Sequence, residues 1–210
     1  MASSRTEAVV QTREQAEVEF SRIVAFSDGV FAIAITLLVL ALEVPAGSDL
    51  VDALRDRGEE FFAYFLSFAV VGRFWMSHHG LFGSIARFDQ PLLAINLAYL
   101  AFIALIPFTS EILGEYSDDS AGVALYAANL TLVTACSFAI IRYASRRELM
   151  RVEETDYRVR RATASTLVVT AVFAVSIPIA FVSPLLATIS WASLFLVGDR
   201  FTERIAGPAT

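Results

Sequence analysis

The stretch FSDGVFAIAITLLVL, from Phe26 to Leu40, is almost entirely apolar, yet it carries Asp28 near its start. A helix needs about 20 mostly apolar residues to cross a bilayer, and the run from 23 to 42 reaches that length. An unpaired carboxylate in hydrocarbon is costly, so such a residue normally has a partner. The stretch therefore predicts a membrane-spanning helix whose aspartate meets hydrogen-bond donors on neighbouring helices.

The rest of the chain has the composition of a membrane protein. Of its 210 residues, 56% are hydrophobic and 18% are charged, and the mean hydropathy is +0.61. A soluble domain of this length carries more charge and fewer long apolar runs. We expect an all-α membrane domain over 21–200 with six spans, at about 23–42, 61–79, 91–110, 121–142, 163–182 and 185–198.

The connecting segments alternate in charge. Acidic residues dominate 44–60 and 111–120, whereas arginines dominate 143–162 and occur in both terminal segments and near the 80–90 turn. Because arginine excess marks the cytoplasmic side, both termini are predicted to be cytoplasmic, with tails at 1–20 and 201–210. The first 20 residues are polar and mixed in charge, which is not typical of a cleavable signal peptide.

Several kinds of chemistry have little support in the sequence. All 16 basic residues are arginine, which excludes a lysine Schiff base, and Cys136 is the single cysteine. His78 and His79 are adjacent, so on a helix their side chains diverge by about 100° and are poorly placed to bind one metal ion. We expect no metal site, no cofactor, no enzymatic activity and no nucleic-acid partner.

Polar residues of the first three spans reach a common depth on the cytoplasmic side. Asp28 lies a few residues into the first span, and the second span ends near that level with Trp75, His78 and His79, while Asn96 lies near the start of the third span. The carboxylate accepts hydrogen bonds, and the other side chains can donate them. The grouping predicts a polar clamp that fixes spans one to three, with members Arg22, Phe26, Ser27, Asp28, Trp75, His78, His79 and Asn96. Hydration of Asp28 at the membrane interface is the alternative.

A stripe of the first span points away from Asp28. Ile33, Thr36, Leu37 and Leu40 follow the i, i+3, i+4, i+7 spacing of one helix face, and Leu37 lies about 180° around the helix from Asp28. Periodicity alone leaves two environments open for this face, namely lipid or an axis shared between subunits.

Two segments resemble a known family. Residues 22–28 read RIVAFSD, and residues 74–82 read FWMSHHGLF. The first segment matches the R-x-x-x-F-S-D motif of the transmembrane protein 175 family of potassium channels, and the other segment is similar to the end of that family's second span. The resemblance covers spans one to three; spans four to six match only in number and hydropathy.

The resemblance implies a homotetramer in a prokaryotic plasma membrane, because the chain is similar to the single six-span form. It implies that the first span lines a central pore whose constriction lies at Ile33. Leu37 and Leu40 would lie further along the pore, and Thr36 would take the place of the family's pore threonine. It also implies a clamp that joins Arg22, Asp28, a histidine and Asn96, and it leaves the choice between His78 and His79 open.

The expected function is a moderately selective, leak-type potassium channel. No segment has a T-V-G-Y-G-like filter, so a neck of branched apolar side chains at Ile33 takes that role, with K⁺ as the permeant ion. Glu43, at the outer end of the first span, is expected to attract cations. The alternatives are a proton-coupled secondary transporter that uses Asp28 and His78 or His79, and a membrane scaffold without transport.

Overall fold

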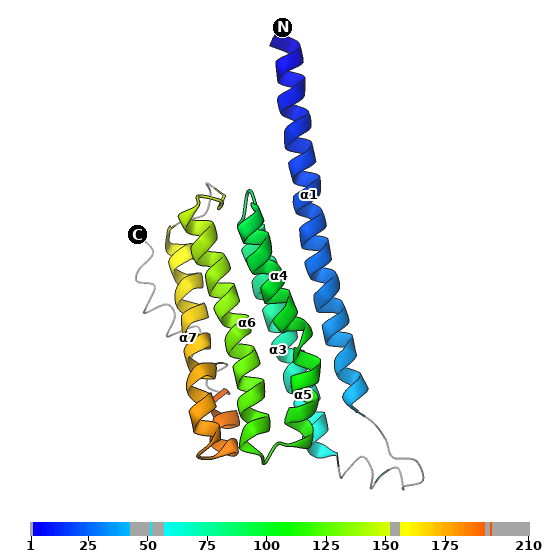
Figure 1. Cartoon of the computed structure of the whole chain (residues 1–210), viewed down its shortest axis with the longest axis vertical. Helices are drawn as coiled ribbons and strands as arrows, with labels where there is room; N and C mark the ends of the chain where they lie inside the picture. Colours follow the sequence, from blue (N-terminus) through cyan, green and yellow to red (C-terminus); the bar gives the residue numbers. More distant parts are fainter. Residues whose placement is uncertain (1, 43–50, 52–56, 152–155, 192–193, 195–210) are drawn as a thin grey trace.

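The computed structural model describes residues 2–42, 51, 57–151, 156–191 and 194. The described chain is helical, as the apolar runs predict (Figure 1). The elements, in chain order, are α1 (Ala2–Leu37), the short 3-10 helix η1 (Leu38–Ala41), α3 (Gly58–Gly83), α4 (Gln90–Ala104), α5 (Ile106–Glu115), α6 (Ser120–Arg146) and α7 (Asp156–Ala180). A further helical segment follows over 184–191.

Helix α1 is longer than the expected first span. It runs without interruption from the polar N-terminal segment into the apolar stretch, and its N-terminal part projects well beyond the ends of the other helices (Figure 1). The expected tail at 1–20 is therefore helical from Ala2 onward. The remaining helices form a bundle beside the C-terminal part of α1.

Aspartates start two of the helices. Asp89 precedes α4 and accepts a hydrogen bond from the Leu92 N–H at 3.0 Å. Asp119 precedes α6 and accepts one from the Ala121 N–H at 2.8 Å. Side-chain acceptors at this position bind backbone N–H groups that have no partner within the helix.

The third expected span consists of two helices. The helix is interrupted at Leu105, between α4 and α5, and Pro107 lies in the first turn of α5. Proline has no backbone N–H to donate to the preceding helical turn, so it does not continue a helix that comes before it. Asn129 of α6 donates to the Phe102 carbonyl at 3.2 Å, so a buried side chain from another helix supports this break.

The core is centred on α6. Its buried side chains include Tyr126, Leu130, Val133 and Ile140, and α7 packs mainly against it. Gly114 allows α5 to approach α3 closely, because a Cβ atom there would lie 3.2 Å from the Glu60 Cα.

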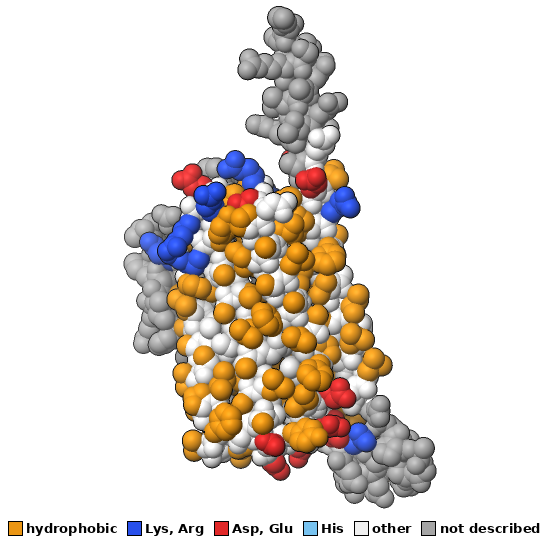
Figure 2. All heavy atoms as spheres, in the orientation of Figure 1, with side chains coloured by type: hydrophobic (Ala, Val, Ile, Leu, Met, Phe, Trp, Pro, Cys, Tyr) orange, Lys and Arg blue, Asp and Glu red, His pale blue; other side chains and the backbone are white. Residues whose placement is uncertain are grey.

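The two ends of the bundle differ in charge. Arginines gather at the end from which α1 projects, while the visible side chains of the opposite end are mostly acidic (Figure 2). The wide belt between them is dominated by apolar side chains. This distribution of charged and apolar side chains is typical of a protein that spans a bilayer and has an arginine-rich cytoplasmic side.

Four helical stretches of the described chain are long and apolar enough to cross a membrane, namely Glu17–Ala41, Gln90–Glu115, Ser120–Arg146 and Tyr157–Ala180. Helix α3, which contains the expected second span, and the segment over 184–191 are not among them. Six spans, the side on which the termini lie and the tetramer all stay predictions.

The arginine-rich end is held by a contact between two connections. Ile85 and Met150 form an antiparallel bridge, and the Ala86 N–H donates to the Leu149 carbonyl at 2.8 Å. Tyr143 of α6 donates its hydroxyl to Asp89 Oδ2 at 2.7 Å. These bonds join the α3–α4 turn to the end of α6.

Candidate functional site

The apolar part of α1 has two distinct faces. Ser27, Phe31, Ala34 and Leu38 are buried, at 3% exposure or less, and their spacing of three to four residues defines one helix face. On the opposite face Ile33 is 61% exposed and Leu40 is 68% exposed. Leu37 and Thr36 are exposed on this same face. The four residues of the predicted stripe thus share one surface of the subunit and contact little of the bundle.

Thr36 is the polar member of that surface. Its hydroxyl donates to backbone carbonyls of its own helix, with distances of 3.0 Å to the Ala32 oxygen and 2.9 Å to the Ile33 oxygen. A hydroxyl has one proton and two acceptor lone pairs. Because the proton is directed to the backbone, the oxygen presents acceptor capacity to whatever lies beside the exposed face.

Asp28 contacts α3. Its Oδ1 accepts a hydrogen bond from the Trp75 indole N–H at 2.9 Å. The Trp75 ring also packs against His79, with centroids 5.5 Å apart, and His79 is exposed. Arg22 is exposed and is not a hydrogen-bond partner of Asp28. It lines a shallow depression together with Phe26.

A second set of polar contacts connects three helices. Asn96 of α4 donates through Nδ2 to Ser27 Oγ at 3.1 Å. Its Oδ1 lies 2.9 Å from His78 Nε2, and Ser27 donates to the Ile23 carbonyl at 2.9 Å. Because Asn96 bonds both neighbours, α1, α3 and α4 are joined through a single buried amide.

Aromatic rings enclose His78. Its ring lies 4.1 Å from the Phe82 centroid and 5.3 Å from the Tyr99 centroid, in stacked geometry. Phe31 of α1 completes the enclosure at 5.5 Å. Sequence reasoning did not identify these aromatics. Phe82 lies four residues after His78, and Tyr99 lies three residues after Asn96. This helical spacing is the signal in the sequence from which the two aromatic residues could have been identified.

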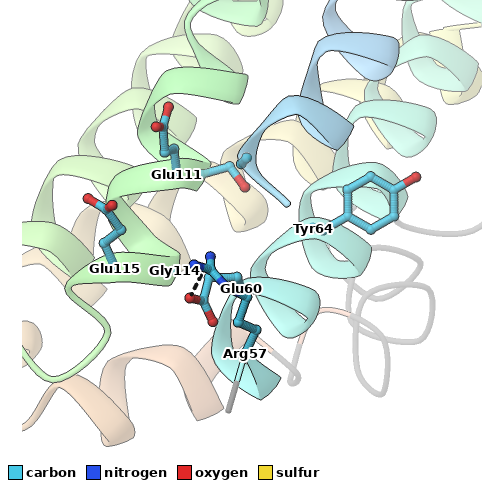
Figure 3. Close-up of a pocket in the computed structure, with 8 residues that line it drawn as sticks. Arg57, Glu60, Tyr64, Glu111, Gly114 and Glu115 are labelled. Carbon is cyan, nitrogen blue, oxygen red and sulfur yellow. Dashed lines mark hydrogen bonds and ion pairs between the residues drawn. The ribbon is translucent and has the colours of Figure 1, made fainter. Parts of the chain in front are cut away.

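At the other end of α1, residues of α3 and α5 surround an acidic pocket of about 140 Å³ next to Ala41 (Figure 3). Glu111 and Glu115 come from α5, while Arg57 and Glu60 come from the start of α3 and pair at 3.5 Å. Glu43, the predicted cation-attracting residue, lies outside the described residues. Within the described chain, no group of three or more His, Cys, Asp or Glu side chains is placed to hold a metal ion.

Comparisons with known proteins give the same family as the motifs. Residues 22–107 match the family model described as "Endosomal/lysosomal potassium channel TMEM175". The chain is 41% identical over 118 residues to a potassium channel of Streptomyces collinus, a match that covers 55% of this chain and 57% of that protein. It is 40% identical over 134 residues to the endosomal/lysosomal proton channel TMEM175 of Bos taurus, covering 57% of this chain and 28% of that protein.

Solved structures extend the similarity beyond the matched segment. The crystal structure of a lysosomal potassium-selective channel TMEM175 homolog from Chamaesiphon minutus superimposes with a TM-score of 0.77 at 27% identity, over 89% of this chain and 99% of that one. A structure of the potassium channel MtTMEM175 shares the fold, with a TM-score of 0.60 at 20% identity over 86% of this chain and 89% of that one. The resemblance of the two sequence motifs to the TMEM175 family is confirmed, because residues 22–107 match the model of that family and the similar proteins are ion channels. The chain spans little more than half the length of the Streptomyces collinus channel.

Proposed function

We propose that the chain is one subunit of a potassium-permeable, moderately selective, leak-type cation channel. Four copies in a prokaryotic plasma membrane would surround a central pore lined by α1. The observation that carries the proposal is the outward face of α1, where Ile33, Thr36 and Leu40 are exposed while the opposite face is anchored in the bundle. The names of the bacterial relatives support potassium as the permeant ion.

Ile33 is assigned to the constriction. A ring of four branched side chains makes a narrow, poorly wetted neck, and such hydrophobic constrictions control permeation through their hydration. An ion must shed part of its water there, and K⁺ releases water at lower cost than Na⁺. The Thr36 oxygens, about one helical turn away, would replace some of the lost water. Selectivity of this kind is moderate because no rigid cage of carbonyl oxygens surrounds the ion.

The polar contacts on the other side of α1 hold that helix in place. Trp75 binds Asp28, and Asn96 links Ser27 to His78. We assign these contacts to the clamp that fixes the orientation of the pore-lining face. In this assignment His78 is the clamp histidine, and His79 supports Trp75 by ring contact.

The acidic end of the bundle would concentrate cations at the outer mouth. Glu60, Glu111 and Glu115 surround a pocket beside the end of the α1 region. Fields from clustered charge of one sign raise the local concentration of counter-ions. Glu43 is proposed to act in the same way at the outer end of the first span.

A proton-coupled secondary transporter is the second candidate, and the names of the mammalian relatives, which are proton channels, favour proton movement in general. A proton-coupled transporter would use Asp28 with His78 or His79 as titrating groups. In the described structure Asp28 bonds Trp75 and His78 bonds Asn96, so these two groups have no direct hydrogen bond to each other. The geometry supports structural roles for them better than a proton relay.

A flux assay on purified protein in liposomes separates the candidates. With a potassium gradient and no proton gradient, a channel passes K⁺ without moving protons itself. A protonophore then only increases the K⁺ flux, because it relieves the membrane potential that the flux creates. A coupled transporter instead acidifies or alkalinises the lumen in step with K⁺. Ile33→Asn should raise the K⁺ flux or reduce the preference over Na⁺, whereas Val175→Asn, on an exposed position of α7, should leave both unchanged. Equal K⁺ flux and equal K⁺/Na⁺ preference in the two variants would show that Ile33 does not lie in the pore.

A further inference from the structure

A long groove runs along the bundle between α3 and α7. It consists of two adjoining pockets of about 390 Å³ and 250 Å³, which share Arg73 of α3 and Ser165 of α7. Helices α3 and α7 line its two sides, and α6 contributes residues to both pockets. The proposed pore does not use this groove.

The larger pocket is basic and about half of its lining is polar. Arg158 and Arg161 enter it from α7, and hydroxyls of Ser77, Ser137 and Thr166 line it from all three helices. It lies at the start of α7, the end at which the arginine-rich connection is found. Guanidinium groups with neighbouring hydroxyls are the donor set that binds phosphate in proteins.

The smaller pocket is apolar. Leu66 and Val70 of α3 face Val169 and Phe173 of α7 across it, and Trp191 lines it as well. The residues of each helix are spaced by four, so each set continues one helix face from the basic pocket toward the middle of the bundle. From Ser77 to Leu66 the groove follows α3 for about 16 Å, and one leaflet of the hydrocarbon core is about 15 Å thick.

Arg73 lies where the two pockets meet. Its Nη1 donates to Ser77 Oγ, and this neutral acceptor does not balance the positive charge of the guanidinium. A charge at this depth of a membrane helix requires an anionic or hydrated partner, and a long arginine side chain can reach toward the interface to find one.

We propose that this groove binds one anionic phospholipid from the leaflet on the arginine-rich side. The phosphate and its headgroup would contact Arg158 and Arg161 with Arg73 below them, and one acyl chain would lie along Val70, Val169 and Phe173. The assignment rests on a basic polar pocket that continues into an apolar one over the length of a leaflet. It is independent of ion permeation, because none of these residues belongs to the proposed pore.

The headgroup is tested by native mass spectrometry of the full chain in nanodiscs that contain phosphatidylglycerol and phosphatidylcholine with the same acyl chains. We expect the protein to retain phosphatidylglycerol, and Arg158→Gln/Arg161→Gln to reduce its apparent affinity by about 30-fold, since each arginine near an anionic surface contributes about a fivefold factor. Arg146→Gln/Arg160→Gln removes two exposed arginines of α6 and α7 that do not line the groove, and should have little effect. Equal loss in both double variants, or none in either, would overturn the proposal.

The acyl chain is tested separately by filling the apolar pocket. Val169→Trp should displace the lipid while Leu167→Trp, at an exposed position of α7 outside the groove, should retain it. Gel filtration in detergent verifies that each variant remains folded. A photoreactive benzoylphenylalanine at Val70 should form an adduct with phosphatidylglycerol. An adduct with a second copy of the chain, or displacement of the lipid by inorganic phosphate alone, would contradict the proposal, because the groove would then be a subunit interface or a simple phosphate site.

Discussion

The Trp75 indole N–H donates to Asp28 Oδ1 at 2.9 Å and so joins α3 to the apolar part of α1. The aspartate is thereby directed toward the side of α1 that contacts the bundle, while Ile33 and Leu40 remain on the exposed side. We propose that this contact helps to fix the rotation of α1 about its own axis, together with the Asn96–Ser27 bond. Loss of this contact should disturb the orientation of the exposed face before it disturbs helix formation.

A double-mutant cycle measures the Trp75–Asp28 contact. Hydrogen bonds to charged groups are worth about 1.5–3 kcal/mol, and the partial exposure of Trp75, at 41%, places this bond near the lower limit. We expect Trp75→Phe and Asp28→Ala to lower the free energy of unfolding by non-additive amounts, with a coupling of about 1.5 kcal/mol. Thermal denaturation in detergent gives the four values. Purely additive effects would show that the indole and the carboxylate do not interact in the folded protein.

The same variants test assembly. Asp28→Ala should reduce the yield of tetramer more than it changes the K⁺/Na⁺ preference of the channels that do form, because Asp28 faces away from the proposed pore. Native mass spectrometry gives the oligomer distribution, and bi-ionic potentials give the preference. Normal tetramers with altered preference would place Asp28 in the permeation path instead.

Asn96 should be more sensitive than its partners. Asn96→Leu removes two hydrogen bonds and leaves Ser27 and His78 buried without that partner, so we expect a loss of about 2–6 kcal/mol in stability, at about 1–3 kcal/mol for each of the two groups. Ser27→Ala is the matched control, since it removes the bond from Asn96 Nδ2 and the Ser27 bond to the Ile23 carbonyl but keeps the His78–Asn96 bond, and it should cost about 1–2 kcal/mol. Thermal unfolding of the two variants side by side provides the comparison. A larger effect of Ser27→Ala would argue against Asn96 as the link among the three helices.

The shared depth of Asp28, Trp75, His78 and Asn96 could be anticipated from the sequence. Apolar run lengths and the alternation of charge fix where each helix enters the bilayer, and the rise per residue then places the polar groups. Which donor bonds which acceptor could not be anticipated, because that depends on helix rotation and side-chain packing. The choice of His78 over His79 as the partner of Asn96 is of this kind.

Other features depend on contacts between distant segments. The Asn129 bond to the Phe102 carbonyl and the bridge between Ile85 and Met150 leave no periodic signal. The break beside Pro107 is different, because proline acts on its own helix and needs no contact with a distant segment. Arg22 is exposed and its long flexible side chain can turn to solvent, so its place in the clamp stays a prediction.

Thr36 tests the contribution of a hydroxyl oxygen beside the proposed neck. Thr36→Val keeps the shape and removes the oxygen, so the K⁺/Na⁺ preference should fall severalfold, whereas Thr36→Ser should retain most of it. Both should leave the stability within about 0.5 kcal/mol, as expected for an exposed position. Bi-ionic potentials in planar bilayers provide the measurement. Identical preference in the valine and serine variants would assign the discrimination to Ile33 alone.

Acid sensitivity is expected at the arginine-rich end. Burial raises the pKa of Asp89, but the hydrogen bonds from Tyr143 and the Leu92 N–H, together with the charge of Arg147, outweigh it and hold the pKa below its ordinary value. A carboxyl whose pKa is lower in the folded state stabilises the protein at pH values above its unfolded pKa. This stabilisation is lost as the pH falls through the folded value. Tyr143→Phe removes one lowering contact and so raises the folded pKa of Asp89; the total loss of stability should be smaller and should be complete at a higher pH.

The measurement is the melting temperature between pH 3 and pH 7. Asp89→Asn is the control, because the amide keeps an acceptor for the Leu92 N–H and does not titrate. In that background Tyr143→Phe should no longer change the pH profile. A shift that persists in the Asp89→Asn background would assign the acid sensitivity to another group, and Asp89 would then be only a helix cap.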